Sequence, residues 1–215
     1  MILSRGRRYL FIHIPKTGGT SMALALEARA MKDDLMLGDT PKAMQRRHRL
    51  KSVQSRGRLW KHATMADIDG LVGLDELPDL FCFTLVRNPW ERTASYYHWL
   101  RSQSFEHNSV RLAKTLTFDA FVQHPKTLSS LKASPAAGYM TDASGQERCD
   151  LYIRLEHLAH DIAALEAHLG FSLQIPKVNA SEKPARWQSL FSNESVDALS
   201  KVCANDIQRF GYRFE

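Results

Sequence analysis

The strongest constraint on the fold of this chain is a short apolar run that leads directly into a glycine-containing turn. The run, Tyr9–Ile14, is rich in β-branched and aromatic residues and has no internal Gly or Pro, which is typical of a buried strand. After the turn at Pro15–Gly19, the chain favours a helix through about Met31, with Thr20 or Ser21 as its N-terminal cap. The segment therefore predicts a strand–loop–helix unit with glycines at the junction.

The turn has the chemistry of an anion-binding loop. A helix N-terminus presents N–H groups and the positive end of its dipole, and glycines let the backbone approach an anion closely. Lys16 adds a mobile positive charge, and the Thr and Ser hydroxyls add donors. The loop differs from the Walker A loop of ATP-binding proteins, GxxxxGK[ST]. Lys16 precedes both glycines, and the four residues that separate the glycines of a Walker A loop are missing. A helix-capping turn with a solvated lysine is the alternative.

A second strand–helix junction carries further groups that suit an anion. Leu80–Val86 predicts a buried strand, and Asn88 and Pro89 predict the start of a helix. Arg87 ends the strand, where ligands of open α/β sheets bind, and a guanidinium can fork onto a phosphate. Ser95, two turns into the helix, can add a hydroxyl donor. A salt-bridged strand end is the alternative interpretation of Arg87.

Further strands and helices are expected to alternate along the chain. Asp150–Leu155 predicts a third strand, and Glu156–Leu169 predicts an amphipathic helix closed by Gly170. The remaining expectations are a helix within Lys42–Leu50, a short strand at Leu59–His62, a brief helix from Thr64 to Gly70, a helix capped by Thr117 and a last helix at Ser195–Phe210. This alternation predicts one α/β domain over residues 1–215, with a short, mainly parallel sheet flanked by helices.

Length and composition limit the class of protein. The chain has 215 residues, enough for one well-cored domain. Its first apolar run is too short for a signal peptide or a membrane span, so we expect a cytoplasmic protein. The three cysteines are an odd number without close spacing, which argues against a disulfide framework and a zinc site. The net charge of +6 favours an anionic partner.

Together, the two anion-binding segments resemble those that bind 3′-phosphoadenosine 5′-phosphosulfate (PAPS) in the sulfotransferase superfamily. Pro15–Ser21 (PKTGGTS) is similar to the 5′-phosphosulfate loop, and Arg87–Tyr97 (RNPWERTASYY) is similar to the 3′-phosphate segment. The closer resemblance is to the branch with heparan sulfate 2-O-sulfotransferase and related bacterial proteins, where a strand ending in HIPK precedes the loop. Tyr152–Leu158 and Asp206–Tyr212 resemble later segments of that branch. The resemblance implies a P-loop-type, three-layer α/β domain that transfers a sulfuryl group from PAPS to an acceptor hydroxyl.

The resemblance also implies a role for single residues. Lys16 would lie beside the oxygen that bridges phosphate and sulfate, where negative charge grows as the bond breaks. The 5′-phosphate would be bound by backbone and hydroxyl groups of the loop, from Thr17, Gly18, Gly19, Thr20 and Ser21. Arg87 and Ser95 would bind the 3′-phosphate, which distinguishes PAPS from ATP. Lys183 would belong to a loop that closes over the nucleotide, with a solvated lysine as the alternative.

The acceptor hydroxyl needs a proton acceptor, and the chain has nine histidines. In the resembled branch a catalytic histidine precedes a short helix, upstream of the 3′-phosphate strand, and His62 lies in that context. A neutral imidazole suits general-base work, and Lys61 with nearby arginines would lower its pKa below about 6.5. A surface histidine in a basic loop is the alternative. His13, within the first strand, suits a core position instead.

The acceptor itself is the least constrained partner. A stretch without acidic residues, 42–61, carries eight basic ones: Lys42, Arg46, Arg47, Arg49, Lys51, Arg56, Arg58 and Lys61. It could guide an acidic acceptor such as a sulfated or uronic-acid glycan, or it could be a solvated loop. Residues 40–62 and 101–140 match the family least and would shape the acceptor site. Carbohydrate, lipid, small alcohol and protein tyrosine all remain open as acceptors.

Two other functions compete with sulfuryl transfer. A P-loop nucleotide kinase or other NTPase lacks support, because GxxxxGK[ST] is missing and no acidic magnesium ligand follows a strand. A non-catalytic polyanion-binding protein would use the basic stretch, although no helix-turn-helix or zinc pattern indicates sequence-specific DNA binding. We therefore expect PAPS as co-substrate without a metal, a hydroxyl-bearing acceptor and no nucleic acid as partner. The oligomeric state is not predicted.

Overall fold

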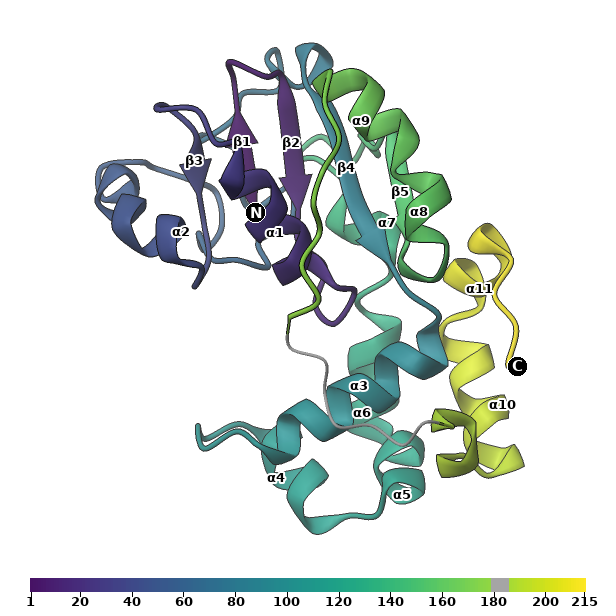
Figure 1. Cartoon of the computed structure of the whole chain (residues 1–215). Coiled ribbons are helices and arrows are strands. Elements are labelled where there is room, and N and C mark those ends of the chain that lie inside the picture. Colours follow the sequence, from purple (N-terminus) through teal and green to yellow (C-terminus); the bar gives the residue numbers. More distant parts are fainter. Residues whose placement is uncertain (179–185) are drawn as a thin grey trace. The chain divides into compact units, whose positions relative to one another are not determined.

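The computed structural model describes residues 1–178 and 186–215 of the chain. The chain divides into two compact units. The first comprises Met1–Val86 and Ala136–Asn179, and the second comprises Arg87–Pro135 and Ala180–Glu215. The first unit contains the β-sheet and the second is helical (Figure 1). That residues 1–215 act as one domain stays a prediction.

The first unit is built on a sheet whose strands lie in the order β3-β1-β2-β4-β5. Their bounds are Ile2–Ser4 for β1, Tyr9–Ile12 for β2, Leu35–Met36 for β3, Phe81–Val86 for β4 and Leu151–Arg154 for β5. β2, β4 and β5 pair in parallel, whereas β1 is antiparallel to both β2 and β3. All strands but β1 therefore run in one direction, and the carboxyl ends of β2, β4 and β5 share one edge of the sheet. The predicted α/β class with a mainly parallel sheet is confirmed.

The sheet buries apolar side chains on both faces because neighbouring residues of a strand point to opposite sides. In β2, Tyr9 and Phe11 pack into one core cluster, and Leu10 and Ile12 pack into another. The first cluster is covered by α1 (Gly19–Ala28) and α9 (Ala163–Leu169). The second cluster is covered mainly by irregular chain between residues 59 and 80. Tyr139, at the end of α7 (Ala136–Tyr139), and the following Met140 also belong to this cluster. Figure 1 shows α1 across the strands and α9 beside them.

Short helices complete the first unit. They are α2 (Pro41–Arg46), η1 (Arg47–Leu50), η2 (Leu77–Asp79), η3 (Leu155–His157) and α8 (Leu158–Asp161). The predicted helix within Lys42–Leu50 is confirmed as α2 and η1. Gly170 closes α9 in the left-handed conformation, with φ 74°, as its position in the sequence predicts.

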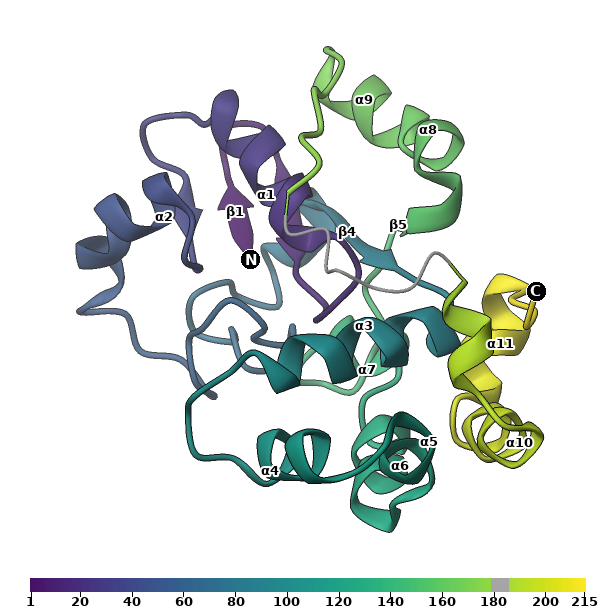
Figure 2. The same cartoon turned by 60° about the horizontal axis from the view of Figure 1, so that its bottom comes forward.

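The second unit is a cluster of helices, which Figure 2 shows with the bottom of Figure 1 turned forward. These helices share an apolar core of their own. Its helices are α3 (Pro89–Arg101), α4 (Asn108–Thr115), α5 (Phe118–Gln123), α6 (Pro125–Lys132), η4 (Trp187–Leu190), α10 (Asn193–Val202) and α11 (Ala204–Phe210). The Asn88 side chain accepts a hydrogen bond from the Trp90 N–H at 3.1 Å, and Pro89 opens α3. Thr117 caps α5 in the same way. Both predicted caps are confirmed.

Several predicted elements are wrong. The expected strand at Leu59–His62 is irregular, because the Ala63 N–H donates to the Trp60 carbonyl in a tight turn at 3.1 Å. The segment from Thr64 to Gly70 forms turns instead of a helix. The N-cap of α1 is Gly18, and neither Thr20 nor Ser21 caps that helix.

Two predicted long helices are broken into shorter ones. Glu156–Leu169 is divided into η3, α8 and α9, and the Asp161 carboxylate at one break accepts hydrogen bonds from the backbone and guanidinium of Arg154. Ser195–Phe210 is divided at Cys203 into α10 and α11. A helical repeat of apolar residues survives such a break, so the sequence pattern does not reveal it.

Candidate active site

The loop between β2 and α1 is shaped by its backbone. Lys16 and Gly18 both adopt left-handed φ values, 67° and 86°. Thr17 is buried, and its hydroxyl donates to the Ile14 carbonyl at 2.8 Å. Within the described chain, no side chain caps α1, and its first turn contains no acidic residue. The start of α1 therefore offers N–H groups and a positive dipole end, as an anion site requires.

Both loop glycines lie against neighbouring side chains. A Cβ added to Gly18 would lie 2.8 Å from Leu155 Cδ1, at the end of β5. A Cβ added to Gly19 would lie 2.1 Å from His13 Cδ2. Neither position has room for a side chain, so the loop backbone packs directly on the residues that follow β2 and β5. The glycines therefore fix the position of the loop as well as opening it to an anion.

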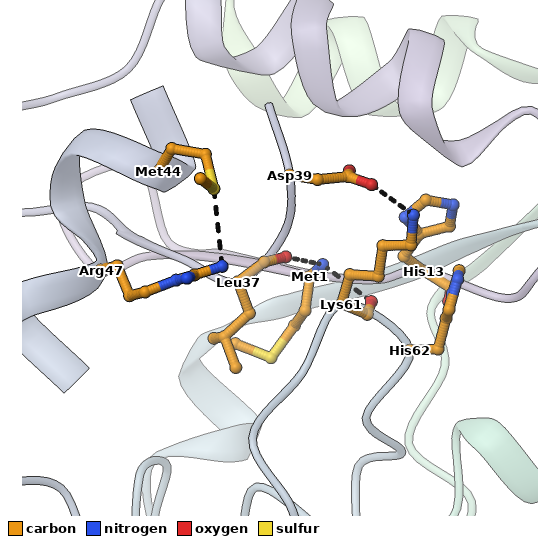
Figure 3. A network of polar contacts seen from close by, with 8 residues as sticks. All are labelled: Met1, His13, Leu37, Asp39, Met44, Arg47, Lys61 and His62. Carbon is orange, nitrogen blue, oxygen red and sulfur yellow. Dashed lines mark hydrogen bonds and ion pairs between the residues drawn. The ribbon is translucent and has the colours of Figure 1, made fainter. Parts of the chain in front are cut away.

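His62 is bonded to His13, the residue that follows β2 and leads into this loop. Its Nδ1 lies 2.8 Å from the backbone carbonyl oxygen of His13. A carbonyl oxygen only accepts, so Nδ1 carries the proton and donates it in this bond. In the neutral imidazole Nε2 is then the nitrogen with a free lone pair. The two imidazole rings lie edge to face with centroids 4.6 Å apart (Figure 3).

Burial keeps both imidazoles neutral. Burial, together with the Lys61 charge and the Met1 amino group, lowers the pKa of His62 to about 4, and the bond to the His13 carbonyl and the Asp39 charge oppose this shift. Burial also lowers the pKa of His13 well below its usual value, helped by the Met1 amino group, His62 and Lys61. At neutral pH His62 is therefore able to accept a proton at Nε2.

A polar network that reaches the surface at Asp39 lies next to the two histidines. The Lys61 ammonium lies 2.6 Å from the Asp39 carboxylate, and the Met1 amino group donates to the Leu37 and Lys61 carbonyls (Figure 3). A cavity lined in part by His13, Thr20 and Lys61 has about 10 Å³ of water-accessible space. That volume admits about one water molecule, so the cavity itself is too small for a nucleotide.

Most basic side chains of the stretch 42–61 are already bonded to other groups of the first unit. Lys42, Arg46, Arg49 and Arg56 donate to backbone carbonyls of the first unit, among them those of Glu27, Met31, Lys32 and Ala143, and Lys61 binds Asp39. These basic side chains stabilise the fold of the segment between α1 and β4. Their guanidinium and ammonium groups still contribute positive charge to the surface of this segment.

The second predicted anion-binding segment lies in the second unit. Arg87 forms an ion pair with Glu91, with Nη2 2.9 Å from Oε1 and Nε 3.3 Å from Oε2. Both side chains are largely buried, at 11% and 17% exposed. Ser95 lies on α3 and is buried. Glu91 is a partner that the sequence pattern did not identify, although its spacing of four residues on a helix is the signal of such a pair.

The predicted site residues are thus distributed over both units. Lys16 to Ser21 and His62 belong to the first unit, and Arg87 and Ser95 belong to the second. Lys183 lies outside the described residues. Two contacts of the first unit were not foreseen: the His13 carbonyl as the partner of His62, and Trp60, whose ring centroid lies 5.0 Å from that of His62. The assembly of one nucleotide site from all these residues stays a prediction.

Two absences concern only the parts of the chain that the structure describes. In residues 1–178 and 186–215, every helix is too short or too polar to cross a lipid bilayer. Across the same residues, no three His, Cys, Asp or Glu side chains are grouped as a metal site requires.

A glycine loop follows a parallel strand of the α/β sheet, and a neutral histidine is bonded to the residue two positions before Pro15, where that loop begins. The model of the sulfotransferase family matches residues 1–213, so the chain belongs to the sulfotransferase family. The predicted enzyme class, a PAPS-dependent sulfotransferase, is thereby confirmed.

The comparison with solved structures includes a mouse enzyme. This chain is similar to the crystal structure of mouse sulfotransferase SULT7A1 complexed with PAP, with 13% sequence identity. The match covers 95% of this chain and 84% of the mouse chain, with a TM-score of 0.49. No curated protein matches the sequence.

Proposed function

We propose that this enzyme transfers the sulfuryl group of PAPS to an acceptor hydroxyl by in-line displacement, with His62 as the general base. The hydrogen bond of 2.8 Å from His62 Nδ1 to the His13 carbonyl carries this proposal. It directs the lone pair of Nε2 away from the strand, and burial keeps the ring neutral at neutral pH. His13 lies two residues before Pro15, so the base is attached beside the loop that binds the sulfuryl donor.

The loop residues bind and stabilise the donor end of the reaction. The N–H groups at the start of α1 and the hydroxyls of Thr20 and Ser21 bind the 5′-phosphate. Lys16 places its ammonium at the oxygen between phosphorus and sulfur, where negative charge develops as the sulfuryl group leaves. The Thr17 hydroxyl is bonded to the Ile14 carbonyl, so Thr17 contributes its backbone N–H to the anion. Catalysis then consists of positioning and charge stabilisation.

The segment at the start of α3 binds the 3′-phosphate. Arg87 donates from its guanidinium, whose Nε and Nη2 groups bond to Glu91 in the free enzyme. Ser95 donates its hydroxyl to the same phosphate. The acceptor presents its hydroxyl to His62 Nε2, and the positive charge of the stretch 42–61 favours an acidic acceptor such as a carbohydrate with carboxylate or sulfate groups.

Calorimetric titration with PAP, the desulfated product, and with ADP tests this proposal. PAP and ADP each carry two phosphates, but PAP carries its second phosphate on the 3′ oxygen and ADP carries it on the 5′-phosphate. We therefore expect PAP to bind at least about ten times more tightly, because a charge-assisted hydrogen bond to the 3′-phosphate contributes about 1.5–3 kcal/mol. Equal affinity for the two nucleotides contradicts the assignment of Arg87 and Ser95. Hydrolysis of magnesium–ATP, together with failure to bind PAP, would instead identify an NTPase.

A further inference from the structure

His62 lies in a loop whose two ends, near residues 56 and 69, are joined by backbone hydrogen bonds. The Arg56 N–H donates to the Asp69 carbonyl at 2.8 Å, and the Gly57 N–H donates to the Asp67 carbonyl at 2.9 Å. Inside the loop, Ala63 and Met65 are buried in the apolar core of the first unit. A loop with bonded ends and buried anchors keeps a defined shape. The backbone positions from which its outer side chains project are therefore fixed relative to His62.

Two side chains on this loop are exposed next to His62. Burial alternates along residues 58–60: Arg58 and Trp60 are exposed, and Leu59 packs against the core between them. Trp60 is 44% exposed, and its ring meets the His62 ring nearly perpendicularly, at 85°. The Arg58 guanidinium carbon lies over the indole, 5.7 Å from the centroid. The loop thus presents a cation, an aromatic surface and an imidazole in a row.

We propose that Arg58 and Trp60 form the acceptor subsite, and that this subsite selects a hydroxylated six-membered ring that carries an anionic group. This inference rests on the proposed role of His62 as the general base. The Trp60 indole stacks on the ring of the acceptor, the Arg58 guanidinium binds its anionic group, and His62 Nε2 receives the proton of its hydroxyl.

The distances suit one ring that spans the three groups. Stacked rings lie with centroids about 4.5–7 Å apart, and the His62 ring is 5.0 Å from the indole. A ring that stacks on Trp60 therefore lies close enough to place a substituent at His62. The guanidinium presents a planar fork of donors that matches a carboxylate or a sulfate, whereas a neutral ring leaves it without a partner.

Two matched pairs of acceptors test the subsite. The first pair is methyl glucuronide and methyl glucoside, and the second is 4-hydroxybenzoate and 4-hydroxybenzamide. The members of a pair share a ring and differ in charge, and the two pairs distinguish a sugar from an aromatic ring. The rate of sulfuryl transfer from PAPS is measured for wild type, Arg58→Gln, Trp60→Ala and Trp60→Phe. Lys201→Gln, which removes one exposed positive charge on α10, is the control.

We expect wild type to favour the anionic member of at least one pair by about tenfold or more in kcat/KM, as one charge-assisted bond provides. Arg58→Gln should remove this preference and leave the neutral acceptor within about twofold of wild type. Trp60→Ala should lower kcat/KM for both members by about five- to tenfold, and Trp60→Phe should restore part of it. Affinity for PAP should not change in any of these variants, and Lys201→Gln should behave as wild type.

Three results overturn the subsite while the proposed function stands. They are a wild type without preference for the anionic ring, an Arg58→Gln variant that keeps the preference, and a protein that binds PAP but sulfates none of the four rings. A protein that does not bind PAP overturns the proposed function, and the subsite with it. The two failures are therefore distinguishable in the nucleotide titration alone.

Discussion

The two anion-binding segments of this protein are built by different means. The loop after β2 relies on its backbone: Gly18 is the N-cap of α1, with φ 86°, and no acidic residue lies in the first turn of that helix. The segment after β4 relies on a side chain, and that side chain, Arg87, is bonded to Glu91. The loop offers the dipole and N–H groups of α1 to an anion directly. Arg87 has to share or exchange a carboxylate partner before it binds a phosphate.

This difference suggests separate contributions to function. Groups that are fixed before binding act best where charge develops in the transition state, because they need no rearrangement. A guanidinium that exchanges one anion for another contributes mainly to selectivity, because its net gain in free energy is smaller. We therefore expect changes beside the loop to affect turnover, and changes at Arg87 to affect the choice of nucleotide.

The largest expected effect is the loss of the base. His62→Ala should lower turnover by about 10²–10⁴, which is the usual contribution of a positioned general base. Affinity for PAP should stay nearly constant, because His62 faces the acceptor. Single-turnover sulfation measures the rate, and calorimetry measures the affinity. His157→Ala, at an exposed position, is the matched control. A variant with wild-type turnover would show that His62 is a bystander.

Lys16→Ala should have the next largest effect. Removal of a donor at the developing negative charge costs about 10²–10³ in turnover. Binding of the desulfated product should fall less, because the charge that Lys16 stabilises is greatest in the transition state. Lys16 has a left-handed φ of 67°. Alanine has a Cβ as lysine has, so the substitution adds no backbone strain at this position. Loss of affinity without loss of turnover would contradict this role of the loop.

Changes at Arg87 should affect the preference for PAP over ADP. Arg87→Gln should lower the affinity for PAP by about tenfold or more and leave the affinity for ADP unchanged. Glu91→Gln removes the competing carboxylate, so we expect PAP to bind a few-fold more tightly, as one exchanged ion-pair partner implies. Calorimetric titration of both variants with both nucleotides checks this. If Glu91→Gln weakened PAP binding instead, Glu91 would position Arg87 and not compete for it.

The smallest expected effects concern the stability of the loop. Gly18 and Gly145 share a φ of 86°, but a Cβ at Gly18 meets Leu155, and a Cβ at Gly145 has nothing within 4 Å. Both substitutions to Ala should cost about 1–2 kcal/mol for the left-handed backbone. Gly18→Ala should cost a further 1–3 kcal/mol, about the penalty of overpacking. Urea unfolding compares the two, and equal losses would mean that Leu155 moves away freely.

The sequence predicted the parts of the fold in which local signals are long. β2, β4 and β5 were each expected within about two residues of their bounds, and Asn88 with Pro89 marked the start of α3. β1 and β3 were not predicted. They have three and two residues, too few for a periodic pattern, and they exist because each pairs with a neighbouring strand.

The sequence predicted which residues belong to the candidate site, but not which groups they are hydrogen-bonded to. A resemblance indicated His62, but the bond that defines its tautomer comes from a main-chain carbonyl 49 residues earlier, which no side-chain pattern encodes. Its pKa is lowered chiefly by burial, and burial in an irregular loop depends on tertiary packing. The sequence named Lys61 as a charge that lowers this pKa, and Lys61 does so. The basic stretch was identified by composition, whereas its bonds to carbonyls follow from the fold.

The central claim, transfer from PAPS with His62 as the base, is tested most directly by the pH dependence of labelled sulfuryl transfer in wild type and His62→Ala. The base acts when neutral, so activity is present above its pKa and is lost as the pH falls through it. We predict that kcat/KM of wild type stays level below pH 6.5 and falls near the His62 pKa of about 4. The fall in kcat should lie at higher pH, because the bound anionic donor favours the imidazolium. A fall in kcat/KM of wild type near pH 6.5, or the same acidic fall in kcat/KM of His62→Ala, would contradict the account.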